Sequence, residues 1–182
     1  MVKWRRLSFS LAILLVLAMV VPASAYEKFD QRWSSNKIVW YYDNYIEGAA
    51  KNAYASGAGS WNDTKIDASL SFSAAYDVYC ATVDNSEVFW DGVSMLAFNP
   101  KTNYFVSKDA FVYLNKAMDA WKYTDSLASV ACHEFGHVFG LDENGTTRTI
   151  MNQYTWGDNS RFETYRLTSP TADDIAGVNS IY

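Results

Sequence analysis

Both histidines of the 182-residue chain lie within one pentapeptide, His133-Glu134-Phe135-Gly136-His137. On an α-helix, side chains four residues apart lie one above the other on the same face, so the two imidazoles can point at a single ion. Glu134 lies about 100° further round the helix, beside that ion and not bound to it. The pattern therefore requires a helix at this point in the fold and predicts a two-nitrogen zinc site on it.

Glu134, next to the first histidine, points to a catalytic use of the site. A catalytic zinc site takes a third ligand from the protein and leaves the fourth position to water. Zinc acidifies that water toward a pKa of about 7, and a neighbouring carboxylate can then act as general base. Paired histidines can also serve packing or surface hydrogen bonds, but this chain has no histidine elsewhere, which favours the metal site.

The residues after His137 are suited to complete the site. Gly140 can adopt the left-handed conformation that ends a helix, and such a turn brings the chain back toward the ion. A carboxylate just after this turn is well placed to ligate, and both Asp142 and Glu143 stand there. Met151 follows eight residues after Glu143, although a lone methionine is more often core filler.

Residues 133–143, HEFGHVFGLDE, resemble the zinc motif of the metzincins, and most closely that of the matrixins, H-E-x-x-H-x-x-G-x-x-H. Met151 lies at the family's spacing for the methionine turn that packs beneath the zinc. Residues 167–182 are more weakly similar to the family's closing helix. Four residues match the motif position for position: His133, Glu134, His137 and Gly140.

The resemblance implies a fold and an activity. The fold is expected to be α+β, a zincin-like catalytic domain with a twisted mixed sheet, an active-site helix and a C-terminal helix. The activity is expected to be that of a zinc endopeptidase, with Glu134 as general base and a protein or peptide as substrate. Residues 93–98 stand where the family has the edge strand to which an extended substrate adds. A silent zincin-like binding protein and a purely structural zinc site are the alternatives.

The chain departs from the family pattern at Glu143, where the matrixins have histidine. A site with three histidines is impossible here, so we interpret Glu143 as the third ligand, as in peptidases that use two histidines and a glutamate. Asp142 is the nearest alternative. A distant carboxylate, as in thermolysin-like enzymes, would leave the turn at Gly140 and Met151 without explanation. The distant candidates are Glu163, Asp173 and Asp174.

Residues 1–25 are typical of a secretory signal peptide. Three basic residues (Lys3, Arg5 and Arg6) precede an apolar run of 11 residues, which is followed by the small-residue site Ala23-Ser24-Ala25. The run is well short of the roughly 20 residues needed to cross a bilayer. We therefore expect residues 26–182 to be secreted as one monomeric metallopeptidase domain that keeps no membrane segment.

The charge of that domain argues against some partners. The whole chain has a formal net charge of -5, and loss of the three basic residues with the leader moves it to -8. Nucleic acid and anionic lipid bind to basic surfaces, so neither is expected as a partner. A hydrophobic content of 49% is typical of a globular protein.

The rest of the sequence predicts one compact domain without repeats or linkers. Alternating and β-branched stretches predict strands, with a hairpin between the last two, and a small oxygen-bearing side chain at Thr124 or Asp125 is expected to cap the motif helix. The expected strands are 37–42, 70–76, 93–98 and 105–114; the expected helices are 49–61, 124–140 and one that follows residue 169.

Cofactors and cysteines complete the expectations. One catalytic zinc is expected, because no further histidines exist for the additional structural zinc of matrixins. Calcium binding stays open, since scattered oxygen ligands leave no readable spacing. Cys80 and Cys132 are expected to form a disulfide in the oxidising compartment, with two buried free thiols as the alternative. Tyr154, three residues after Met151, is interpreted as a wall residue of the cleft.

Overall fold

The computed structural model describes residues 26–145 and 147–182. The signal peptide predicted over residues 1–25 lies outside these described residues. Within them, no helix is both long and apolar enough to span a membrane.

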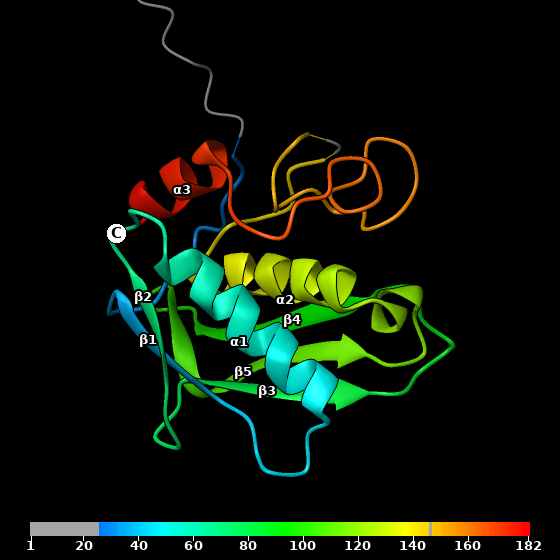
Figure 1. The fold of residues 1–182 in the computed structure, drawn as a ribbon. Coiled ribbons are helices and arrows are strands. Elements are labelled where there is room, and N and C mark those ends of the chain that lie inside the picture. The colour runs from blue at the N-terminus through cyan, green and yellow to red at the C-terminus, as the bar shows by residue number, and fades with distance from the viewer. Residues whose placement is uncertain (1–25, 146) are drawn as a thin grey trace, which may run out of the picture.

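The described chain forms a sheet covered on one face by helices (Figure 1). Helices α1 (Gly48–Asn62) and α2 (Thr124–Phe139) pack side by side across the sheet. Helix α2 lies between the sheet and the segment that joins it to α3 (Ala172–Asn179). The α+β class predicted from the sequence is confirmed, with both the motif helix and the C-terminal helix in place.

The sheet contains both parallel and antiparallel pairs, and one of its two edges is the fourth strand in the chain. In chain order the described strands are β1 (Lys37–Tyr41), β2 (Ser69–Phe72), β3 (Val78–Val83), β4 (Gly92–Asn99) and β5 (Tyr104–Asn115). They lie in the order β2-β1-β3-β5-β4, with β4 antiparallel to β5 and the other pairs parallel. Because β4 pairs on one side only among the described strands, its other side can receive an extended peptide.

Three of the predicted strands and the predicted hairpin agree with the structure. The stretches 37–42, 93–98 and 105–114 correspond to β1, β4 and β5, and the last two pair as an antiparallel hairpin. The alternating apolar residues of β1 and β5 lie on the buried face of the sheet, whereas Met95 and Phe98 of β4 are exposed. On the buried face, Trp40 of β1 packs edge-on against Phe135 of α2 with ring centroids 5.4 Å apart. This contact couples the sheet directly to the helix that carries the zinc motif.

The region between β1 and β4 differs from the prediction. The strand expected over 70–76 ends at Phe72, because the chain bends at residues 74 and 75 and again at Asp77, whose carboxylate accepts a hydrogen bond of 2.9 Å from the Val39 N–H. Strand β3 follows this turn and was not predicted. Val78, Tyr79, Thr82 and Val83 are residue types that favour strands, so the prediction missed a signal that the sequence carries; β3 pairs with β1 on one side and with β5 on the other.

Helix α1 contains a glycine that the packing of the two long helices requires. A Cβ at Gly57 would lie 2.8 Å from the backbone of Ala131 and of Cys132 in α2. The close approach also allows the Trp61 indole to donate a hydrogen bond of 2.8 Å to the Cys132 carbonyl oxygen. Gly57 lowers the helix propensity of α1, but its lack of a side chain lets α1 pack closely against the helix that carries both histidines.

Helix α2 begins where the sequence predicts, but without the predicted cap. Thr124 is the first helical residue, and no side chain of the described residues caps the free N–H groups. The Ser126 hydroxyl instead donates hydrogen bonds to carbonyl oxygens of the preceding 3-10 turn (Asp119–Lys122) and of Tyr123. The capping role predicted for Thr124 or Asp125 is therefore wrong, because this turn leads the chain directly into the helix.

The predicted disulfide is absent, and both cysteines are buried free thiols. Cys132 is directed toward α1, where its Sγ lies 3.2 Å from the Ser60 hydroxyl oxygen, whereas Cys80 lies in β3 within the core. Burial raises the pKa of Cys132 to about 12. The alternative of two buried thiols thus describes the structure, because each cysteine fills a separate position in the core.

Candidate metal centre

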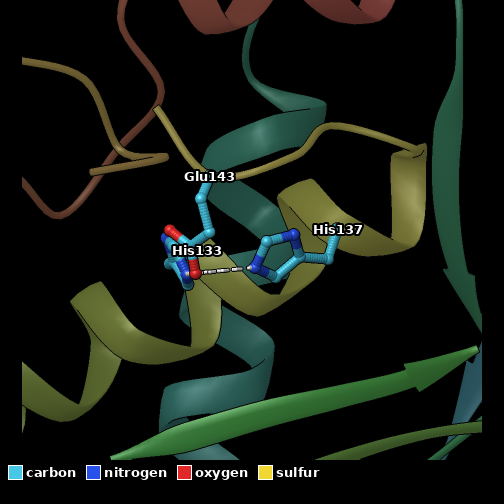
Figure 2. Close-up of side chains that lie close together, drawn as sticks. All are labelled: His133, His137 and Glu143. Atoms are coloured by element: carbon cyan, nitrogen blue, oxygen red, sulfur yellow. Dashed lines mark hydrogen bonds and ion pairs between the residues drawn. The ribbon is translucent and has the colours of Figure 1, made fainter. Parts of the chain in front are cut away.

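The two histidines of α2 lie one helical turn apart and point to the same place (Figure 2). His133 and His137 are buried, and their Nε2 atoms are 3.1 Å apart. Each ring is held from behind, because its Nδ1 lies 2.9 Å from a backbone carbonyl oxygen, that of Ile150 for His133 and that of Leu141 for His137. Helix α2 therefore presents two oriented imidazoles, as the spacing predicts.

The hydrogen bonds behind the rings determine what each Nε2 can offer. A carbonyl oxygen only accepts, so a neutral imidazole in this position carries its proton on Nδ1 and its lone pair on Nε2. Two lone pairs then face each other across 3.1 Å and repel unless a positive charge lies between them. A proton or a metal ion meets this need, and a carbonyl behind each histidine is typical of metal sites.

Glu143 comes from the loop after α2 and completes the cluster (Figure 2). The helix ends at Gly140, which has a φ of 103° and donates its N–H to the His137 carbonyl oxygen at 2.8 Å. After this turn, Glu143 Oε1 lies 3.4 Å from Nε2 of His133 and 3.5 Å from Nε2 of His137. Among the described residues, these three side chains form the group that could hold a metal ion.

The spacing of the three donor atoms fits zinc. Ligands about 2.0–2.1 Å from a tetrahedral centre lie about 3.3–3.4 Å from one another, and the three separations here are 3.1, 3.4 and 3.5 Å. Glu143 Oε2 is buried and has no hydrogen-bond partner among the described residues, so it too can face a cation. Two imidazole nitrogens and a carboxylate oxygen are donors that zinc accepts.

Burial and mutual contact shift the pKa values of the cluster. Burial lowers the pKa of His133. Burial would also lower the pKa of His137, but the hydrogen bond with Glu143 and the charge of Glu134 outweigh it and raise that pKa. Burial would raise the pKa of Glu143, but both imidazoles hold it well below its usual range. Because His137 and Glu143 shift each other's pKa in this way, protons and a metal ion compete for the cluster.

The other carboxylates considered as ligands are engaged elsewhere. The Asp142 carboxylate accepts the Glu143 N–H at 2.8 Å. Glu163 accepts a hydrogen bond from the Gly157 N–H, and Asp173 of α3 accepts one from the Asn144 side-chain amide. Asp174 is buried below the cluster, where it accepts backbone N–H groups. The structure therefore brings Glu143, and none of these four acids, to the histidines.

Glu134 lies beside the cluster without joining it. Its side chain is buried, and Oε2 accepts a hydrogen bond of 2.8 Å from the Ser94 hydroxyl of β4. A Cβ at Gly92 would come within 2.9 Å of Glu134 Oε1, so the glycine leaves room for the carboxylate. Sequence reasoning missed Ser94, because a serine in a strand carries no signal until the strand is placed against the helix.

Met151 lies beneath the cluster, as the resemblance implies. It packs so closely against Gly136 of α2 that a Cβ there would overlap the methionine sulfur. Asp174 of α3 holds the backbone of this turn by accepting the N–H groups of Ile150 at 2.9 Å and Met151 at 3.2 Å. Because the Ile150 carbonyl contacts His133 Nδ1, Asp174 supports the first histidine through the turn.

Replacing Asp174 with alanine should destabilise the protein by about 3 kcal/mol, because two buried N–H groups lose their acceptor and each orphaned donor costs about 1–3 kcal/mol. Urea unfolding of the two proteins measures the difference. Asp174→Asn should fall between them, since it keeps one acceptor oxygen. An equal loss in the exposed-site control Asp158→Ala would contradict the assigned role.

A cleft of about 480 Å³ opens over the cluster. The start of β4 and the residues before it form one wall, and residues 153–156 form another. Tyr154 stands in the second wall and is half exposed, which agrees with its interpretation as a wall residue. Arg161 also lines the cleft although only 2% of it is exposed. The sequence did not single out Arg161, because arginine is mostly a surface residue and nothing local marks it as buried.

Comparisons with known proteins agree with this description. No curated protein matches the chain. A chain of the solved structure "GM1 bound form of the ECX AB5 holotoxin" has a similar fold, with a TM-score of 0.54 and 13% sequence identity over 87% of this chain and 88% of that chain. At this identity the likeness concerns the fold alone. The family model described as Matrixin matches residues 30–182. Because that match spans nearly all of the described residues, the zinc motif included, the chain belongs to the matrixins, a family of zinc metallopeptidases.

Proposed function

We propose that the protein is a secreted zinc endopeptidase that hydrolyses internal peptide bonds. The observation that carries the proposal is the convergence of two imidazole nitrogens and a carboxylate oxygen beside a separate buried carboxylate, Glu134, in an open cleft. Membership of the matrixins supports a zinc metallopeptidase. The roles of single residues, the endopeptidase specificity and the export of the chain are the further content of the proposal.

Three residues would hold the metal: His133, His137 and Glu143. When bound, zinc supplies Lewis acidity, which lowers the pKa of a water molecule toward about 7 and polarises the scissile carbonyl. The carbonyl oxygens behind the two imidazoles keep the Nε2 lone pairs directed at the ion.

Glu134 moves the proton. Ser94 holds the carboxylate through Oε2 and leaves Oε1 available. Glu134 Oε1 takes a proton from the attacking water and then delivers it to the amide nitrogen as the carbon–nitrogen bond breaks. The new carboxyl group and the new amine then leave the cleft, and Glu134 is again ionised for the next turnover.

The edge strand orients the substrate. An extended peptide can pair with the free side of β4 through backbone hydrogen bonds. The residues of β4 nearest the cluster, Gly92 to Ser94, line the cleft, so a peptide on this strand passes over the metal ligands. Backbone pairing needs no particular side chain, which suits cleavage within unfolded or loop segments.

A protein that only binds zinc would gain nothing from Glu134. This acid is 3% exposed and forms no ion pair with any described residue. Burying an ionised group without a partner of opposite charge destabilises the folded protein. A catalytic role explains why Glu134 is buried in spite of this. A purely structural zinc would also call for a fourth protein ligand, whereas the described residues offer a group of three.

Export rests on the sequence of residues 1–25, which has the basic, apolar and small-residue parts of a signal peptide. We propose cleavage after Ala25, so that the working protein is residues 26–182. Mass spectrometry of protein recovered from the medium of expressing cells should find Tyr26 at the amino terminus. An intact residue 1 in that material would contradict this part of the proposal.

Removal of the metal tests the activity itself. Residues 26–182 should hydrolyse casein, lose at least about 100-fold of that activity in a zinc chelator, and regain it when zinc is restored, because metal catalysis supplies several kcal/mol of transition-state stabilisation. Elemental analysis should find one zinc per chain in the active form. Casein left intact by the zinc-loaded chain would instead favour a silent binding protein.

A further inference from the structure

We infer that Arg161 makes the cleft a binding site for a carboxylate of the peptide substrate. The inference rests on the proposed peptidase function, because it names a feature of the substrate at the same site. The carboxylate can come from two sources: an aspartate or glutamate side chain near the scissile bond, or the carboxyl terminus of the peptide.

Arg161 is a buried cation at the wall of the cleft. Only 2% of it is exposed, yet it lines the cleft together with His133, Glu134 and Glu143. Arginine keeps its charge in proteins, and a buried charge needs partners to offset the loss of water. The position of Arg161 therefore has to be explained by what its guanidinium binds.

The protein itself satisfies only part of the guanidinium. Nη1 donates to the Asn152 carbonyl oxygen at 2.8 Å, and Nη2 donates to the Thr155 hydroxyl at 2.8 Å. Both acceptors are neutral. Nε is buried and has no hydrogen-bond partner among the described residues. A guanidinium has five N–H donors, so the described residues leave at least the Nε–H without an acceptor.

The nearby acids do not supply that acceptor. Glu134, Glu143 and Asp91 act on the charge of Arg161 from a distance, but none forms an ion pair with it in the described chain. Glu143 faces the two histidines, and Glu134 is bonded to Ser94. A bound zinc ion carries two positive charges and would neutralise the two negative charges of Glu134 and Glu143. Of these three acids, only Asp91 would then be left to balance the positive charge of Arg161.

A substrate carboxylate fits what is missing. Its two oxygens can accept parallel hydrogen bonds from the fork of N–H groups on one edge of a guanidinium. The cleft, at about 480 Å³, has room for a side chain beside the backbone of a bound peptide. Neutral amides of the same shape cannot pair with the charge, so they provide matched controls.

Pairs of fluorogenic peptides that differ in one carboxylate test the inference. One arm compares aspartate with asparagine, first at the residue before the scissile bond and then at the residue after it. The other arm compares a peptide that has a free carboxyl terminus with the same peptide ending in an amide. We expect kcat/KM to favour the acid over the amide by about 10- to 100-fold in one arm, since a hydrogen bond to a charged group has that value. Equal values in every pair would overturn the inference.

Variants of Arg161 connect the preference to this residue. In Arg161→Met the ratio of acid to amide should fall to about one, and Arg161→Lys should keep part of it, because it keeps the charge without the fork. The ratio does not depend on the total activity of each variant. If circular dichroism shows that Arg161→Met does not fold, the acid-to-amide ratio of Arg161→Lys is compared with that of the wild type and still tests the inference. A preference that survives unchanged in both variants would contradict the inference.

Binding without turnover separates this inference from the proposed function. In the Glu134→Gln background, calorimetry should find tighter binding of the acidic peptide than of its amide, and Arg161→Met should remove the difference. If the wild-type chain cleaves neither casein nor any peptide, the peptidase proposal fails while this measurement still tests the carboxylate site. If cleavage occurs and no pair differs in rate or binding, only the carboxylate site fails.

Discussion

Replacing Glu134 with glutamine should lower kcat on casein by about 10²- to 10⁴-fold while the zinc content stays at one per chain. The size of the loss is that of a general base removed from a rate-limiting proton transfer. Glutamine keeps the shape of the side chain and an oxygen for the Ser94 hydroxyl, but it cannot take a proton from water. Zinc should remain, because Glu134 is not part of the group of donor atoms.

The matched control for this variant is Glu27→Gln, which removes the same charge from an exposed position. It should leave kcat within a factor of about two, since surface substitutions rarely have larger effects. Full activity of Glu134→Gln would refute the assignment of the general base. Loss of zinc together with activity would instead mean that Glu134 acts on the metal, which its contact with Ser94 argues against.

The sequence could predict the part of the site that one continuous segment carries. The spacing of His133 and His137 determines that both imidazoles share a helix face, and Gly140 is needed because the chain turns there with a φ of 103°. Glu143 follows within three residues of that turn, so its place at the histidines depends on local geometry only. Helical periodicity and the geometry of a glycine turn are enough to reach these positions.

The parts that the sequence could not predict depend on contacts between distant segments. Ser94 reaches Glu134 only because β4 lies against α2, and Arg161 is buried only because the loops after α2 fold over it. Neither residue type is unusual where it stands. The predicted pairing of Cys80 with Cys132 failed for the same reason, since counting two cysteines does not indicate which way each one faces.

Replacing Glu143 with alanine should weaken zinc binding by more than about 100-fold. Loss of a residue that only supports a ligand weakens metal binding by about 10- to 100-fold, and here a direct ligand is removed. Competition with a fluorescent chelator measures the affinity. Asp142→Asn is the matched control and should bind zinc almost as tightly as the wild type, because it keeps the oxygen that accepts the Glu143 N–H. An equal loss of zinc affinity in the two variants would contradict the assignment of Glu143 and favour Asp142 as the third ligand.

The pH dependence of zinc binding gives the same variant a second signature. Protons compete with the metal for the cluster, so zinc affinity rises as the pH passes upward through the pKa of the ligands. In the wild type, Glu143 raises the pKa of His137 against the effect of burial. Without Glu143 the burial effect remains, and the pKa of His137 should fall. The pH at which the zinc affinity of Glu143→Ala reaches half of its own high-pH value should therefore move down, even though that high-pH value is lower than in the wild type. An unchanged midpoint would mean that Glu143 does not share the proton that zinc displaces.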